Sequence, residues 1–145
     1  VELKMNTKVK DYDGRNVYFD DQEPIETATL LWAAGVKPNQ IEGLSESSYA
    51  PNGRILVDKF TEVIDHPGVY AVGDNCLLAD ETYPKGHPQV AQVALQQASN
   101  LAKNFERARR GKNPEPFHYK DLGSMATIGK HLAVVDLPFI KFHLY

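Results

Sequence analysis

The sequence contains a single cysteine, Cys76, among its 145 residues. One thiol cannot form an internal disulfide, and it supplies neither a CxxC redox pair nor the thiolate ligands of a zinc or iron–sulfur site. The five histidines show no HxxxH or similar spacing, so we expect no metal site. The sequence also lacks a signal-peptide pattern and any run of 18 uncharged apolar residues, so we expect no membrane-spanning helix.

Composition is that of a globular protein, with 42% apolar and 24% charged residues. The length suits one domain with a core and is too short for two complete nucleotide-binding domains. Charge is uneven: residues 1–99 carry eight Lys/Arg against fifteen Asp/Glu, whereas residues 100–145 carry eight against four. A basic cluster comprises Arg107, Arg109, Arg110 and Lys112. It would suit an anionic membrane or nucleic acid, but a solvated helix end is the plainer interpretation, and we expect no nucleic-acid partner.

Several segments have the patterns of β-strands. Alternation over residues 1–9, the turn residues Asp13-Gly14 and the run 17–19 predict a β-meander. The continuous apolar run 28–35 predicts a strand buried on both faces, as in a parallel sheet. Further short strands are predicted at residues 55–57, 69–72, 117–119, 125–128 and 132–135.

One long helix is predicted between Pro88, which suits a first helical turn, and Gly111, which suits a left-handed cap. Apolar residues at helical spacing form one predicted face: Ala91, Ala94, Ala98, Leu101 and Phe105. The opposite face carries Gln89, Gln92, Gln96, Ser99 and Lys103, which in an isolated helix would be a solvated surface. These elements together predict an α/β fold, or α+β for the chain as an isolated fragment.

Gly73 and Asp74 follow the strand predicted at 69–72, in the position where α/β sheets bind ligands. A carboxylate there can accept hydrogen bonds from ribityl or ribose hydroxyls, and glycine lets the backbone approach a phosphate. An isolated Gly-Asp pair is usually a turn. The order Gly53-Arg-Ile-Leu-Val-Asp58, a spacer, then His66-Pro-Gly-Val-Tyr-Ala-Val-Gly-Asp74 is much more specific.

This arrangement resembles the second FAD-binding motif of the flavoproteins with two dinucleotide-binding domains. The resemblance implies that Asp74 holds the ribityl chain and pyrophosphate of FAD, with Gly73 beside it. Residues 29–35 are similar to the apolar strand that leads out of the NAD(P)H domain in these flavoproteins. The resemblance therefore places Ala34 and Gly35 on the NADH side.

Residues 88–97 point to one family among these flavoproteins. Ala91, Gln92, Ala94 and Gln96 match the AQxAxQ signature of type II, non-proton-pumping NADH:quinone oxidoreductases. Residues 119–129 and 133–138 are also similar to the C-terminal region of that family. The resemblance implies a flavoprotein that passes electrons from NADH through FAD to membrane quinone.

Roles for individual residues follow from this resemblance together with helix geometry. Free N–H groups near residues 90–92 can face the electron-rich edge of an isoalloxazine, so Ala91, Gln92 and Val93 are candidates for FAD binding. Gln92 and Gln96 lie one turn apart and can donate hydrogen bonds to quinone carbonyls. Lys130 would stabilise the reduced flavin, or is a surface lysine in a turn. No residue is assigned as catalytic.

The absence of GxGxxG indicates that both phosphate-binding turns lie outside this sequence. We therefore expect a C-terminal portion, inactive alone: residues 1–45 would end the NADH-binding domain, 46–112 would form the second half of the FAD domain, and 113–145 would begin a membrane-associated region. The resemblance implies peripheral attachment to the cytoplasmic side of the cell membrane, and it leaves a homodimer open.

Two rival interpretations remain at this stage. Another reductase of the same superfamily, acting on ferredoxin or a disulfide, would share the FAD motif, although AQxAxQ and the lack of a dithiol argue against it. A non-catalytic binding module could also keep the fold.

Overall fold

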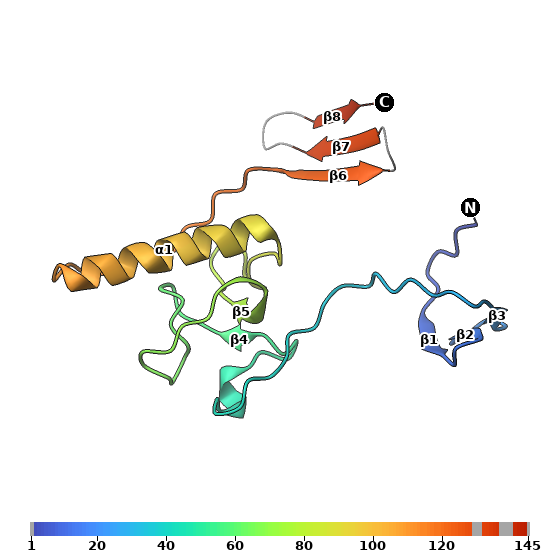
Figure 1. Ribbon diagram of the computed structural model, residues 1–145, viewed down its shortest axis with the longest axis horizontal. Helices are drawn as coiled ribbons and strands as arrows, with labels where there is room; N and C mark the ends of the chain where they lie inside the picture. Colours follow the sequence, from blue (N-terminus) through green and yellow to red (C-terminus); the bar gives the residue numbers. More distant parts are fainter. Residues whose placement is uncertain (1, 129–131, 137–140, 145) are drawn as a thin grey trace. The chain divides into compact units, whose positions relative to one another are not determined.

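A computed structural model describes residues 2–128, 132–136 and 141–144. The chain divides into two compact units, Val1–Val36 and Lys37–Tyr145, and each is described by itself. Figure 1 shows the order of the helices and strands along the chain. The chain is mixed α/β with one long helix, as the sequence predicted. Among the described residues, no helix is both long enough and apolar enough to cross a bilayer.

The first unit contains the predicted meander. Strands β1 (Val9–Tyr12), β2 (Asn16–Phe19) and β3 (Ile25–Glu26) pair antiparallel in that order. The carboxylate of Asp13 closes the first turn by accepting the N–H groups of Arg15 at 2.8 Å and Asn16 at 2.6 Å. These hydrogen bonds stabilise the ionised carboxylate and hold the pKa of Asp13 well below its ordinary value.

Two strand predictions in this unit are wrong. The strand predicted over 1–9 begins only at Val9, because a turn at Met5 and Asn6 interrupts the alternating run, and Asn6 has a positive φ of 55°. Residues 28–35 form no strand, and the side chains of Leu31 and Trp32 are 89% and 64% exposed. A doubly buried strand needs partners on both edges and layers on both faces. The described residues provide no strand that pairs with this run.

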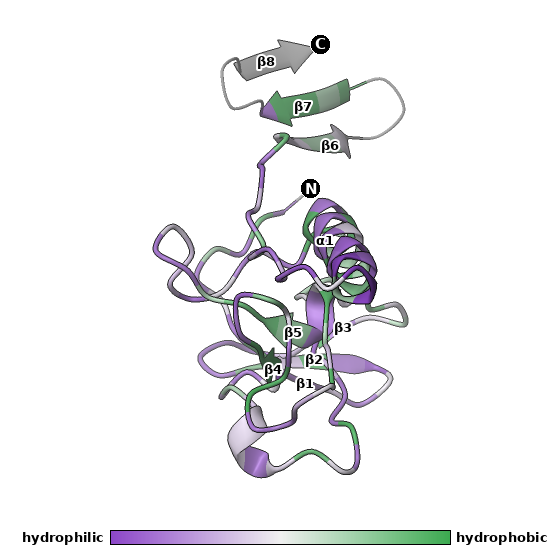
Figure 2. Ribbon diagram, turned by 90° about the vertical axis from the view of Figure 1, so that its left-hand side faces the viewer, coloured by the Kyte–Doolittle hydropathy of each residue, from purple (hydrophilic) through white to green (hydrophobic). Residues whose placement is uncertain are grey.

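The second unit begins with a small core around two short parallel strands. After the short helix η1 (Glu46–Ser48), β4 (Ile55–Leu56) pairs with β5 (Cys76–Leu77), which follows η2 (Gly73–Asn75) directly. Both strands have the green colour of hydrophobic residues in Figure 2. The buried core comprises Ile55, Val57, Val63, Cys76, Leu78 and Phe117.

Three strands expected in this unit are shorter than predicted or absent. The strand expected at 55–57 is confirmed for its first two residues, and Val57 continues only as an isolated bridge to Val63. Residues 69–72 are not a strand, because only Tyr70 forms a bridge, to Glu62. Residues 117–119 belong to no strand. Their apolar residues range from buried, as at Val57 and Phe117, to 43% exposed at Val69. Residues 57, 69–72 and 117–119 lack the ladder of backbone hydrogen bonds that defines a strand.

The predicted long helix is confirmed as α1 (Ala91–Arg109). Gly111 has a φ of +66°, and the N–H of Lys112 donates to the carbonyl of Arg107, which closes the helix as its sequence predicted. At the other end Val90, two residues after Pro88, is the N-cap.

The face of α1 that is buried differs from the predicted one. Its buried residues are Val93, Gln97 and Asn104, whereas Ala91 and Ala98 are exposed and Phe105 is 51% exposed. The prediction counted only apolar side chains. The structure buries two carboxamides on this face because they have main-chain partners.

The C-terminal strands form a third sheet. Strands β6 (Ser124–Ile128), β7 (Leu132–Asp136) and β8 (Lys141–Leu144) pair antiparallel in chain order. The strands predicted at 125–128 and 132–135 are confirmed. No strand was predicted over the residues of β8, which pairs with β7.

Candidate functional site

The predicted ligand turn, η2, packs against the start of α1. Gly73 has a φ of +72°, a conformation that favours glycine. A Cβ at this position would lie 3.2 Å from the Cβ of Ala94, so the turn approaches the helix closely. Glycine at position 73 is therefore required by both backbone conformation and packing.

Gln97 anchors this turn to the helix. Its side chain is fully buried, and its Oε1 accepts the backbone N–H of Gly73 at 2.7 Å and the thiol of Cys76 at 3.4 Å. Its Nε2 has no hydrogen-bond partner among the described residues. Sequence reasoning missed this residue, because the signature it used ends at Gln96.

Asp74 lies at the exposed side of the turn. Its main-chain carbonyl accepts a hydrogen bond from Nε2 of Gln89 at 3.1 Å, which holds the turn from a second side. Within the described part of the chain, its carboxylate forms no hydrogen bond and no ion pair. Nothing among the described residues occupies this carboxylate, and its role in binding hydroxyls stays a prediction.

The first turn of α1 supplies free donors close by. The N–H of Val90 donates to Pro88 and that of Val93 donates to Val90, so neither is available. The N–H groups of Ala91 and Gln92 have no acceptor among the described residues, and the first turn contains no acidic side chain. An electron-rich group is favoured at such a helix start. The side chain of Val93 is buried and only 2% exposed, so it belongs to the interior.

Gln92 and Gln96 do project to one side of α1, as predicted. Their carboxamides are hydrogen-bonded to main-chain groups of residues 120–123. Lys130 lies outside the described residues. Ala34 and Gly35 belong to the first unit and are exposed.

A buried arginine, Arg54, and a buried histidine, His87, lie near β5, the strand that follows η2. Arg54 is 5% exposed, and its guanidinium donates to the carbonyls of Cys76 at 2.7 Å and His87 at 3.1 Å. The ring of His87 is fully buried beside the rings of Tyr83 and Phe117. Burial lowers the pKa of His87, and the nearby Asp80 only partly opposes this effect. Burial therefore favours the neutral form of this imidazole, although Oδ2 of Asp80 lies 3.2 Å from its Nε2.

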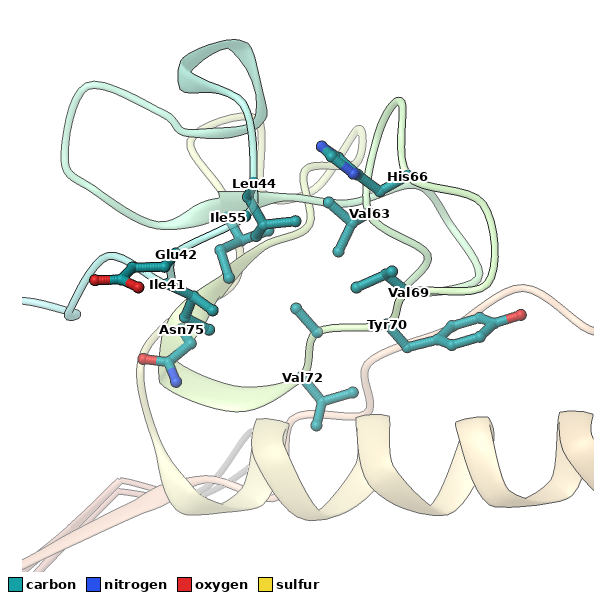
Figure 3. A pocket seen from close by; sticks show the side chains of 12 residues that line it. Ile41, Glu42, Leu44, Ile55, Val63, His66, Val69, Tyr70, Val72 and Asn75 are labelled. Atoms are coloured by element: carbon teal, nitrogen blue, oxygen red, sulfur yellow. The ribbon is translucent and has the colours of Figure 1, made fainter.

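A hollow of about 460 Å³ lies between residues 41–44 and residues 69–75. Figure 3 shows the apolar side chains of Leu44, Ile55, Val63 and Val69 turned into it, with His66 at its rim. None of the predicted FAD-binding residues that the structure describes lines this hollow. Its volume is that of a small-molecule site, but it carries few polar groups to orient a ligand.

Comparison with known sequences identifies the family. The profile of the pyridine nucleotide-disulphide oxidoreductase family matches residues 1–98. The chain belongs to this family. The match includes the Gly73-Asp74 turn and the first turns of α1, where the free carboxylate and the free amides lie.

Individual relatives within the family are more specific. The chain is 34% identical over 140 residues to an internal alternative NAD(P)H-ubiquinone oxidoreductase A1 of Arabidopsis thaliana mitochondria, covering 89% of this chain and 28% of the relative. It is 34% identical over 158 residues to a type II NADH:quinone oxidoreductase of Mycobacterium tuberculosis, covering 100% and 32%. The resemblance predicted from AQxAxQ is thus confirmed. The chain spans about a third of the length of these relatives.

A solved structure shows the same fold. The structure of NDH2 from Plasmodium falciparum in complex with NADH matches with a TM-score of 0.81 at 19% identity, covering 97% of this chain and 44% of that one. At this level of identity the likeness shows the fold alone.

The disulphide chemistry in the family's description has no counterpart in this chain. Cys76 is its only cysteine, fully buried, and burial raises the pKa of its thiol. A member of the pyridine nucleotide-disulphide oxidoreductase family that worked through a dithiol would need two accessible cysteines. This chain has no such pair.

Proposed function

We propose that this chain forms part of the FAD site of a flavoprotein that transfers electrons from NADH to a quinone. One observation carries the proposal. The carboxylate of Asp74, which has no partner within the described residues, lies on a turn that packs against a helix start whose first two N–H groups also have no acceptor there. A carboxylate and free amides together suit a cofactor that has both hydroxyls and an electron-rich edge. The printed names of the relatives support NADH and quinone as the substrates.

The described residues fit FAD. Asp74 would accept hydrogen bonds from ribityl hydroxyls, Gly73 allows close approach, and the N–H groups of Ala91 and Gln92 would donate to the electron-rich edge. FAD, when bound, would supply two-electron chemistry. The chain's own residues bind and orient it, and the absence of acid from the first turn of α1 favours negative charge at that edge. The assignments of Val93 and Lys130 to FAD, and of Ala34 and Gly35 to NADH, stay predictions.

The domain assignments also stay proposals, with residues 1–45 ending an NADH domain, 46–112 in an FAD domain and 113–145 in a membrane-associated region. Exposed apolar side chains at Leu122, Met125 and Leu132 support contact of this last region with a membrane surface. The proposed location is the cytoplasmic side of the cell membrane. Vesicle co-sedimentation tests the attachment, and sedimentation velocity tests a homodimer.

The FAD proposal is tested by replacing the charge on Asp74 in the complete flavoprotein. Asp74→Asn keeps the shape of the side chain and removes its charge, so charge-assisted hydrogen bonds become neutral ones. We expect the dissociation constant for FAD to rise about tenfold. Glu81→Gln, a matched change at an exposed residue, should leave flavin binding unchanged. Equal flavin content in both variants after dialysis would contradict the assignment.

A further inference from the structure

Four carboxamides follow one face of α1 at intervals of four residues: Gln92, Gln96, Asn100 and Asn104. We call this set the carboxamide ladder. All four bind the main chain of residues 115–123, which we call the strap. The strap leads directly into β6.

The two glutamines each bind the strap with both ends of the amide. Gln92 donates through Nε2 to the carbonyl of Gly123 at 2.9 Å and accepts the N–H of Leu122 at 3.1 Å. Gln96 donates to the carbonyl of Lys120 at 2.9 Å and accepts the N–H of the same residue at 3.0 Å. Each carboxamide therefore satisfies one N–H and one carbonyl of the strap's main chain.

The two asparagines bind the beginning of the strap. Asn104 is only 7% exposed; it donates to the carbonyl of Glu115 at 2.9 Å and accepts the N–H of Glu115 at 2.8 Å. Asn100 makes longer contacts to the carbonyls of Glu115 and Pro116, at 3.4 and 3.5 Å. Since Asn104 pairs with the first strap residue and Gln92 with the last, the strap runs antiparallel to the helix.

Helix and strand geometry explain why the spacing fits. Residues four apart on an α-helix are separated by about 6 Å along its axis. Two residues of extended chain span about 6.6 Å. A two-residue step such as Lys120 to Leu122 is therefore long enough to cover the step from Gln96 to Gln92.

The ladder provides most of the attachment of the strap's main chain. Within the described residues, the other main-chain bond from the strap to the rest of the second unit is from the N–H of Phe117 to the carbonyl of Lys59, at 2.8 Å. Beyond Phe117, the hydrogen bonds from Gln92 and Gln96 hold residues 120–123. Both ends of these two amides are occupied, so a direct role in binding another molecule would use only their remaining hydrogen-bonding capacity.

We propose that the carboxamide ladder fixes the register of the strap on α1, which makes Gln92, Gln96, Asn100 and Asn104 positioning residues for the segment that precedes β6. The two glutamines of the AQxAxQ signature are then the first two members of a longer set of side chains with the same role. A further step rests on the proposed function: the ladder positions the wall of the electron-acceptor site, and Asn104 influences that site from about 18 Å along the helix.

Amide hydrogen exchange tests the ladder in the purified protein. We expect the N–H groups of Glu115, Lys120 and Leu122 to be protected, whereas those of Tyr119 and Asp121, which have no acceptor among the described residues, exchange rapidly. Gln96→Ala should accelerate exchange at Lys120, whose N–H Gln96 accepts, roughly three- to tenfold, and Asn104→Ala should do so at Glu115. Ser99→Ala, an exposed change on the same helix, is the matched control. Protection of Lys120 that is the same in Gln96→Ala and Ser99→Ala would overturn the ladder.

A structural failure of these variants is detected separately. Protection of the Phe117 N–H, which Lys59 holds, should persist in every variant that folds. The milder change Gln96→Asn, whose side chain is one methylene too short, should lose protection at Lys120 without loss of the helix. Loss of protection at Phe117 together with Lys120 in both Gln96 variants would show general loosening and overturn the proposal.

Kinetics of the complete flavoprotein test the further step. Asn104→Ala should raise KM for quinone severalfold and leave flavin reduction by NADH unchanged. Asn104→Asp should restore part of the affinity for quinone, because its carboxylate still accepts the Glu115 N–H. An unchanged KM for quinone with lost protection at Glu115 would reject the effect on the electron-acceptor site and keep the ladder. If the wild-type protein reduces no quinone, the proposed function fails, whereas the exchange experiment still decides the ladder.

Discussion

The backbone N–H of Gly73 donates to Oε1 of Gln97 at 2.7 Å, and this bond joins the proposed FAD turn to the middle of α1. Gln97 is one of two adjacent glutamines, and its neighbour Gln96 faces the strap instead. Successive residues on a helix point about 100° apart, so a single Gln-Gln pair holds two different segments of the chain. Helix α1 is therefore the element to which both η2 and the strap are attached.

Charge at position 97 should be strongly destabilising. Gln97→Glu would bury a carboxylate whose donors, within the described residues, are the Gly73 N–H and a thiol, and we expect a loss of about 3 kcal/mol of unfolding free energy at pH 7. Gln97→Met removes the accepted bond but also the unpaired Nε2, so it should cost clearly less. Urea unfolding measures both. Equal stability of the two variants would show that the site admits water.

Gly86 should tolerate no side chain. It has a φ of +88°, and a Cβ there would lie 2.8 Å from Cγ of Leu77 and 3.4 Å from Nη1 of Arg54. Gly43 has a similar φ of +94° with open space around it, which makes Gly43→Ala a control for conformation alone. We expect about 1 kcal/mol for Gly43→Ala and about 3 kcal/mol for Gly86→Ala in urea unfolding. Similar losses would mean that Leu77 moves aside without cost.

The thiol of Cys76 should be unreactive in the native protein. It is fully buried, and burial raises its pKa, so both access and thiolate formation are suppressed. Labelling with an aromatic disulfide reagent should be slow in buffer and complete in denaturant, at one thiol per chain. Rapid stoichiometric labelling of the folded protein would indicate that η2 and β5 separate readily from α1.

Local signals in the sequence were sufficient where the structure is local. Pro88 and Gly111 bracket α1, the turn at Asp13 joins β1 and β2, and β6 pairs with its neighbour β7. A glycine at position 73 was expected for close approach of the backbone to a phosphate, whereas its packing against Ala94 required the structure.

Features that depend on distant partners could not be predicted in the same way. An apolar run such as 28–35 shows that burial would be favourable, but the partner strands decide whether it is buried. A glutamine or asparagine is equally compatible with solvent and with a buried main-chain bond, so neither Gln97 nor Asn104 could be distinguished from the exposed polar residues of α1. The family resemblance identified the AQxAxQ residues, whereas their main-chain partners required the structure.

The buried ring of His87 should make the stability of the protein depend on pH between neutral and mildly acidic conditions. Burial lowers its pKa below 6.5 in the folded state, so the unfolded chain takes up a proton first as the pH falls. The unfolding free energy should be constant with respect to this group above pH 6.5 and decrease below it, by at most about 1.4 kcal/mol per pH unit. His87→Phe keeps an aromatic ring between Tyr83 and Phe117 and removes the titration. Urea unfolding of both proteins from pH 8 to pH 5 should therefore give a difference that shifts in favour of the variant as the pH falls. A difference that is independent of pH would show that His87 titrates equally in the folded and unfolded states.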